Sequence, residues 1–184
     1  VTDREIAVVV NDVGDVNVDA ELVERRVEGV DGEDIVELSN GCICCSIRGE
    51  LAESVVTLAE TERFDHLLVE PSGISDPKQV VQRFLRGTVA DYYDVSSVTT
   101  VVDARRFHDG IETEANDAPT TDDRPLVELM VEGVEFCDTV VVNKTDLVTA
   151  SEGESLLETL RALQPEAAYV PTEFAAVAPE RILG

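Results

Sequence analysis

A polar segment, Asn143-Lys144-Thr145-Asp146, directly follows an apolar run and has the chemistry to recognise a guanine base. The Asp146 carboxylate can accept hydrogen bonds from both the N1–H and the N2 amino group of guanine, and adenine offers no such pair of donors. The Asn143 amide can support the base and its own loop, while the aliphatic stem of Lys144 covers the ring plane. A plain polar turn is the alternative for so short a motif. The strand before it and the helix after it favour guanine recognition.

A second polar segment begins at Glu70 and includes Gly73, after the apolar residues Leu67–Val69. An acidic residue at the tip of a buried strand is where a nucleotidase with a phosphate-binding loop places the carboxylate that organises its magnesium ion. Gly73 has no Cβ, so its backbone can approach a γ-phosphate closely. We therefore assign Glu70 and Gly73 as the candidate catalytic residues. The alternative is a strand end, a glycine turn and a helix cap at Asp76.

Three cysteines, Cys42, Cys44 and Cys45, fall within four residues and follow Gly41, which helps the loop to be tight. Thiolate sulfur is a soft ligand that suits Zn²⁺ or Cu(I). A structural zinc site uses four protein ligands, so three leave an open position, as a site that releases its metal requires. Buried apolar cysteines or a strained vicinal disulfide are the alternatives. Cys137 stands alone, and we expect it to be a small core residue.

The charge of the chain limits its partners. There are 39 acidic and 14 basic residues, a net charge of −25. Such a surface repels phosphate backbones and anionic lipid, so we expect neither nucleic acid nor a membrane as a partner. Hydrophobic residues make up 43% of the chain, too many for a disordered acidic segment, and adaptation to high salt (a halophilic protein) is the simpler reading. Without a bilayer-spanning run, a targeting segment or a spread of cysteines, the sequence indicates a cytoplasmic protein.

Apolar runs alternate with segments of helical spacing along the chain. Strands are expected at residues 5–10, 35–38, 67–69, 95–102, 139–142 and 168–171. Helices are expected at residues 20–29, 48–62, 77–86, 126–136 and 151–163. This alternation predicts an α/β fold in which a mostly parallel sheet carries helices on both faces. Ligands bind at the carboxyl ends of the strands in such sheets, and the three motifs above all follow strands.

Further segments carry weaker signals. Residues 11–19 form a polar, glycine-containing loop that could rearrange with nucleotide state, or a plain turn with Asp19 as a helix cap. Residues 108–124 are expected to form an acidic surface loop. The helix at 151–163 is expected to be capped by Ser151, with Glu154 in the reciprocal position. His66 and His108 lack neighbouring ligands at metal-site spacing, and we expect both to be structural or exposed.

These segments, in this order, resemble the CobW-type family of GTP-dependent metal chaperones, which is related to the UreG and HypB nickel-insertion GTPases. The matching pieces are Asn11-Asp12-Val13-Gly14 with Asp19-Ala20-Glu21-Leu22, Gly41-Cys42-Ile43-Cys44-Cys45, Glu70-Pro71-Ser72-Gly73 with Asp76-Pro77, Val102-Asp103-Ala104, and Asn143-Lys144-Thr145-Asp146-Leu147. The cysteine segment is the most specific, since ordinary GTPases lack it. The resemblance implies a P-loop NTPase-like fold, GTP and Mg²⁺ as cofactors, and delivery of zinc or another transition metal to a client protein.

One departure from the family pattern stands out: no Gly-x-x-x-x-Gly-Lys-Ser/Thr loop occurs in the 184 residues. Such a loop cradles the phosphates and supplies a lysine and a magnesium ligand. We therefore expect residues 1–184 to be a nucleotide-binding domain that lacks its first strand, loop and helix, and that is inactive alone. A longer parent protein is favoured over a decayed relative.

Two other functions compete with a GTPase that handles metal. One is a non-catalytic zinc-binding or metal-sensing module with a vestigial nucleotide site. The other, a thiol redox protein, is weaker because the sequence shows neither a clear Cys-x-x-Cys helix start nor a clear base near the cysteines. The partners that we expect are a guanine nucleotide, a client protein that receives the metal and, as one candidate assembly, a second copy in a homodimer.

Overall fold

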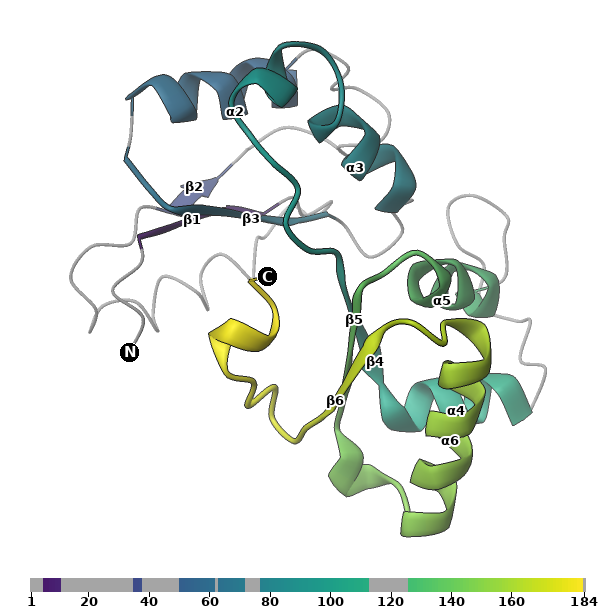
Figure 1. Ribbon diagram of the computed structural model, residues 1–184. Helices are drawn as coiled ribbons and strands as arrows, with labels where there is room; N and C mark the ends of the chain where they lie inside the picture. Colours follow the sequence, from purple (N-terminus) through teal and green to yellow (C-terminus); the bar gives the residue numbers. More distant parts are fainter. Residues whose placement is uncertain are drawn as a thin grey trace. The chain divides into compact units, whose positions relative to one another are not determined.

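The computed structural model describes residues 5–10, 35–37, 50–61, 63–71, 77–112 and 126–183. The chain divides into two units, Val1–Val95 and Ser96–Gly184, which we call the N-terminal and the C-terminal unit. Each has its own three-stranded sheet (Figure 1). Each also has its own hydrophobic core. No helix in the described ranges is both long enough and apolar enough to span a bilayer.

The N-terminal unit is built around β1 (Ile6–Val10), whose apolar residues suit a central strand. It pairs in parallel with β2 (Ile35–Glu37) and with β3 (His66–Glu70). Two helices, α2 (Glu50–Thr61) and α3 (Pro77–Phe84), pack with the 3₁₀ turn η1 (Gly87–Asp91) in the core of this unit. Because the strands are parallel, Glu70 lies at the carboxyl edge of the sheet, opposite the last residue of β1.

An aromatic cluster anchors the core of the N-terminal unit. Tyr93 packs against Phe64 and Phe84, with ring centroids 6.2 and 5.8 Å apart. Its hydroxyl donates a hydrogen bond of 2.7 Å to the Val55 carbonyl of α2. Burial raises the pKa of Tyr93 to about 12, so the phenol stays neutral and keeps its proton for that bond. The ring therefore adds apolar burial without leaving a polar atom unsatisfied.

The C-terminal unit has the strand order β4-β5-β6, and both strand pairs are parallel. Its three described helices pack around one hydrophobic core that they share with the sheet. One 3₁₀ turn follows β5, and another follows β6. The elements are β4 (Thr99–Asp103), α4 (Ala104–Glu112), α5 (Leu126–Glu135), β5 (Thr139–Asn143), η2 (Thr145–Leu147), α6 (Ala150–Leu163), β6 (Ala168–Pro171) and η3 (Pro179–Arg181).

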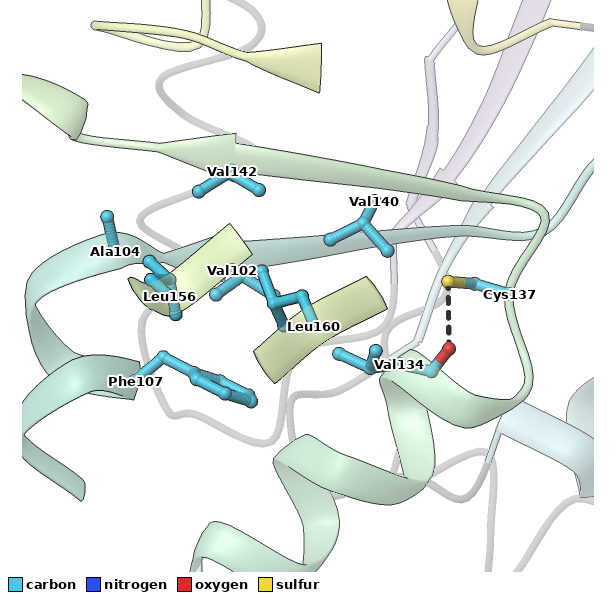
Figure 2. Close-up of a cluster of buried hydrophobic side chains, with 9 residues drawn as sticks. All are labelled: Val102, Ala104, Phe107, Val134, Cys137, Val140, Val142, Leu156 and Leu160. Atoms are coloured by element: carbon cyan, nitrogen blue, oxygen red, sulfur yellow. Dashed lines mark hydrogen bonds between the residues drawn. The ribbon is translucent and has the colours of Figure 1, made fainter. Parts of the chain in front are cut away.

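One face of this sheet packs against all three helices (Figure 2). The buried residues come from β4, β5, α4, α6, α5 and the turn that follows α5, and they are Val102, Ala104, Phe107, Val134, Cys137, Val140, Val142, Leu156 and Leu160. The Cys137 thiol donates a hydrogen bond of 3.2 Å to the Val134 carbonyl, and burial raises the pKa of the thiol. The expectation that Cys137 is a small core residue is confirmed.

The predicted fold class is confirmed, because every strand pair in the described ranges is parallel and helices alternate with strands. The described helices cover one face of each sheet, so helices on the second face stay a prediction. The strand expected at residues 95–102 begins later, at Thr99, because the ladder with β5 starts there. The Val98 amide instead donates to the Asp138 side chain. The helix expected at residues 20–29 lies outside the described residues.

The acidic loop expected at residues 108–124 starts later than predicted, because residues 108–112 belong to α4. The helix continues because Phe107 and His108 are buried and Arg105 pairs with Asp109 one turn later, at 2.8 Å. His108 is therefore structural, as expected. Residues 113–124 lie outside the described residues.

The cap of α6 also differs from the sequence prediction. Thr149, rather than Ser151, is the N-cap residue, and its hydroxyl accepts a hydrogen bond from the Glu152 amide. The Glu152 carboxylate in turn accepts a bond of 2.7 Å from the Thr149 amide, and it also accepts a bond from Arg105 of α4. Both Thr149 and Ser151 have glutamate three residues later, so spacing alone cannot choose between them. The extended backbone of Thr149 and the ion pair to α4 decide the position.

Thr149→Ala should therefore lower the midpoint of thermal unfolding of the 184-residue chain by about 2–4 °C, since an N-cap is worth about 1 kcal/mol. Ser151→Ala is the matched control and should leave the midpoint unchanged. The bonds from Thr149 lower the pKa of Glu152 from 4.5 to about 2. The stabilisation by this carboxylate is thus complete above about pH 4.5 and is lost as the pH falls towards 2. Circular dichroism melts that show the larger loss for Ser151→Ala would contradict this assignment.

Candidate functional site

The end of β5 places the first candidate residues. Three valines, Val140, Val141 and Val142, are almost completely buried and fix the strand in the sheet. Asn143 is its last residue, and Lys144 adopts a left-handed backbone with φ 61° and ψ 39°. This conformation is uncommon for a residue with a side chain, and it turns the chain sharply into η2. Asp146 follows on η2, so the guanine motif lies on one tight loop at the carboxyl edge of the sheet.

Lys144 is held by a carboxylate on the neighbouring strand. Asp103 is the last residue of β4 and lies opposite Asn143 in the parallel register. Its carboxylate accepts a bond of 2.8 Å from Lys144 Nζ and a bond of 3.0 Å from the Arg106 amide. Burial pushes the pKa of Asp103 up, but these bonds outweigh it and leave the pKa below its ordinary value. The pair is partly exposed, so its main effect is to orient the lysine rather than to stabilise the fold.

The segment after β6 is attached to the same loop. The Thr172 carbonyl accepts hydrogen bonds from both the amide and the hydroxyl of Thr145, at 3.2 and 3.1 Å. The Ala175 amide donates a bond of 2.9 Å to Asn143 Oδ1. Thr172 is buried, and its own hydroxyl donates to the Ala176 carbonyl. These bonds join residues 172–176, which we call the β6 loop, to residues 143–146.

Asp146 differs from its neighbours in the loop. Its side chain is exposed, and the described part of the chain provides no hydrogen-bond or ion-pair partner for its carboxylate. Asn143, Lys144 and Thr145 are all engaged by residues from β4 or the β6 loop. The arrangement thus holds a carboxylate towards solvent on a loop that is fixed on both sides. Such a group can accept two hydrogen bonds from a ligand without first losing protein partners.

Comparison with known proteins decides the family of the chain. A sequence model of the CobW/HypB/UreG nucleotide-binding domain matches residues 1–171. The chain belongs to this family. The zinc-regulated GTPase metalloprotein activator 1 of Dictyostelium discoideum is 35% identical over 188 residues, which cover 89% of this chain and 38% of that protein. The zinc chaperone CobW of a Sinorhizobium species is 33% identical over 80% of this chain and 45% of its own length.

A solved structure agrees with the CobW-type fold. The crystal structure of Zn(II)-bound YjiA GTPase from E. coli matches 99% of this chain and 52% of that chain, with a TM-score of 0.64 and 19% identity. At this identity the likeness supports the fold alone. The chain spans less than half the length of the two curated relatives named above.

In this CobW-type chain, the structure brings three of the predicted site residues together: Asn143, Lys144 and Asp146 share one loop. Glu70 ends β3 in the N-terminal unit, where its side chain is exposed at the carboxyl edge of the sheet. Gly73, the loop at residues 11–19 and the metal-ligand candidates Cys42, Cys44 and Cys45 lie outside the described residues. Among the residues that are described, no three metal-ligating side chains converge.

Sequence reasoning missed two contributors to this region of the CobW-type chain. Asp103 was noted only as part of the family match Val102-Asp103-Ala104, and the β6 loop was not considered. The register of β4 against β5, which places Asp103 beside Asn143, was the missing information. Once a parallel order β4-β5-β6 is assumed, the polar residues after each strand become candidates for one shared edge. Thr172, a polar residue directly after an apolar strand, was the available signal for the β6 loop.

The hydrogen bond from Ala175 to Asn143 can be tested without a ligand. Asn143→Ala removes the acceptor, so the Ala175 amide should exchange with solvent faster, roughly two- to tenfold for a bond worth about 0.5–1.5 kcal/mol. Asn143→Asp keeps an acceptor oxygen and is the matched control. Amide exchange measured by NMR checks this. Equal exchange at Ala175 in all three proteins would show that the β6 loop is not anchored by Asn143.

Proposed function

We propose that this chain is the guanine-nucleotide-binding domain of a cytoplasmic GTPase that binds zinc and delivers it to a client protein. The observation that carries the proposal is the loop of Asn143, Lys144 and Asp146, oriented by Asp103 and by the β6 loop in a member of a nucleotide-binding family. The relatives named as zinc-regulated GTPase activators and zinc chaperones support the zinc and GTPase parts.

The base would be read by the exposed carboxylate of Asp146. It accepts the N1–H and N2 amino protons of guanine, while adenine presents an acceptor at N1 and no N2 amino group. The Asn143 side chain already accepts a hydrogen bond from Ala175, so its role is to fix the β6 loop beside the base. The Asp103 carboxylate holds the Lys144 ammonium group to one side, which leaves the lysine stem to lie along the ring plane.

Phosphate and magnesium chemistry would involve the N-terminal unit. Magnesium, when bound with GTP, neutralises charge that develops on the phosphates. Glu70 and Gly73 are the residues that we propose for organising the ion and approaching the γ-phosphate. The printed sequence has no Gly-x-x-x-x-Gly-Lys-Ser/Thr loop, so we propose that these 184 residues alone bind GTP weakly and hydrolyse it negligibly. The second candidate function is a zinc-binding module whose nucleotide site is vestigial.

The zinc ion would be the cargo of the three clustered cysteines. Cys42, Cys44 and Cys45 provide soft sulfur ligands and leave one coordination position for exchange with a client. The fourth cysteine, Cys137, takes no part because it is buried and hydrogen-bonded to Val134. In the proposed sequence of events, nucleotide state changes the affinity of the cysteine segment for zinc. Reciprocal coupling then requires zinc to change the affinity for GTP by the same factor.

The base assignment predicts a change of specificity in Asp146→Asn. The new amide donates where the carboxylate accepted, so guanine should bind at least tenfold more weakly, as expected for a lost charged hydrogen bond worth about 1.5–3 kcal/mol. Xanthine carries a carbonyl in place of the N2 amino group, so xanthosine diphosphate should bind the variant better than the wild type. Calorimetric titration with both nucleotides measures this. Asp94→Asn, an exposed aspartate in the N-terminal unit, is the matched control.

Unchanged preference for GDP in Asp146→Asn would remove Asp146 from the base site. Absence of any guanine-nucleotide binding by the wild-type protein would instead favour the vestigial-site alternative.

The metal assignment predicts that changing Cys42, Cys44 and Cys45 together to Ser abolishes tight zinc binding, with the wild type binding about one zinc ion per chain. Zinc affinity of the wild type should also fall at lower pH, because thiol ligands must lose their protons to bind. Competition with a chromogenic chelator measures both effects. Cys137→Ala is the control and should keep the zinc site. Wild-type zinc affinity in the triple variant would show that the cysteines are not the ligands.

A further inference from the structure

The β6 loop exposes an aromatic side chain that the proposed function has not used. Phe174 is 86% exposed, the most exposed of the large apolar side chains in the described ranges. The transfer of a phenyl ring from water to an apolar environment is favourable, so a ring exposed to solvent is available to bind another apolar surface.

The backbone at Phe174 is constrained. Phe174 and Ala175 both have φ of 53°, and they are two of the three described non-glycine residues with positive φ. The third is Lys144, in the guanine loop. Two consecutive left-handed residues with side chains are costly, and such conformations gather at ligand-binding sites. The strain is maintained because the β6 loop is bonded on both sides of Phe174.

Those bonds place Phe174 next to the base-reading residues. The Thr172 carbonyl, two residues before it, accepts from Thr145, and the Ala175 amide, directly after it, donates to Asn143. The ring thus projects from a short segment whose two ends are attached to the loop that carries Asp146. All of these contacts lie within the C-terminal unit, so the placement does not depend on the N-terminal unit.

We propose that Phe174 is a base-stacking residue that packs its ring against the purine ring of the bound nucleotide. The inference rests on the proposed function and deepens it: Asp146 reads the edge of the base, and Phe174 contacts its face. A planar heteroaromatic ligand fits because its face is apolar and polarisable while its edge carries hydrogen-bond donors. A phenyl ring has no hydrogen-bonding group, so it contributes affinity and does not select among purines.

The absence of tryptophan from the chain makes a direct test available. Phe174→Trp introduces a single indole at the proposed contact, and GDP should quench its fluorescence as the base stacks on it. Inorganic pyrophosphate, which has no base, should leave the fluorescence unchanged. Leu85→Trp, at an exposed apolar position of the N-terminal unit, is the control and should not respond to either probe.

Affinity measurements complete the test. Phe174→Ala should weaken GDP binding roughly 5- to 150-fold, the range expected when one base loses an aromatic stacking partner, and Phe174→Tyr should restore it. In the Asp146→Asn background, Phe174→Ala should weaken the binding of xanthosine diphosphate by a similar factor, because stacking does not depend on the groups at the edge of the base. Leu85→Ala should leave all of these affinities unchanged.

The outcomes separate this inference from the proposed function. If Asp146→Asn changes base preference while Phe174→Ala binds GDP as the wild type does, the stacking role is wrong and the base site stands. If GDP binds and the fluorescence of Phe174→Trp does not change, the stacking role is also wrong. Contact with another protein surface would then be the remaining role for the ring. If the wild-type protein binds no guanine nucleotide, both the proposed function and the stacking role are wrong.

Discussion

The burial of β5 is the constraint on which the proposed base site depends. Val140 and Val142 face the core shared by α4, α5 and α6, and Val141 on the opposite face is also buried. Each fully buried valine contributes about 1.5–3 kcal/mol. Moving the strand by one residue would put Thr139 or Asn143 at a core position that a valine now fills. The register of β5 therefore fixes where the strand ends, and with it the position of Asn143.

Parallel pairing extends this constraint to the neighbouring strands. Because β4, β5 and β6 run in one direction, the residues that follow them meet at the same edge, and short polar contacts join the three segments. Asp103 at the end of β4 holds Lys144, and the β6 loop holds Thr145 and Asn143. None of these contacts is strong by itself, since each is partly exposed to water. Together they fix the loop backbone and leave the Asp146 carboxylate exposed.

The sequence predicted this region unevenly, for identifiable physical reasons. The apolar run before Asn143 indicated β5 and its polar end correctly, because continuous burial leaves a strong hydrophobic signal. The start of β4 was expected too early, because pairing with β5 decides it and that pairing is not visible in a local window. The helix α4 was not predicted, and its last residues were assigned to the acidic loop. The cap of α6 was assigned two residues late, because Thr149 and Ser151 have the same local pattern. Phe174 was overlooked because its role depends on positive φ values, which the side-chain types do not indicate.

The central claim is that the segments after β4, β5 and β6 form one guanine-binding edge. Titration of the isotopically labelled protein with GDP, followed by amide chemical shifts, tests it most directly. We predict the largest shifts in the C-terminal unit at Asp103, residues 143–147 and residues 172–176, with little change in the buried core of that unit. Shifts that leave residues 143–147 and 172–176 unchanged while GDP binds elsewhere on the chain would contradict it.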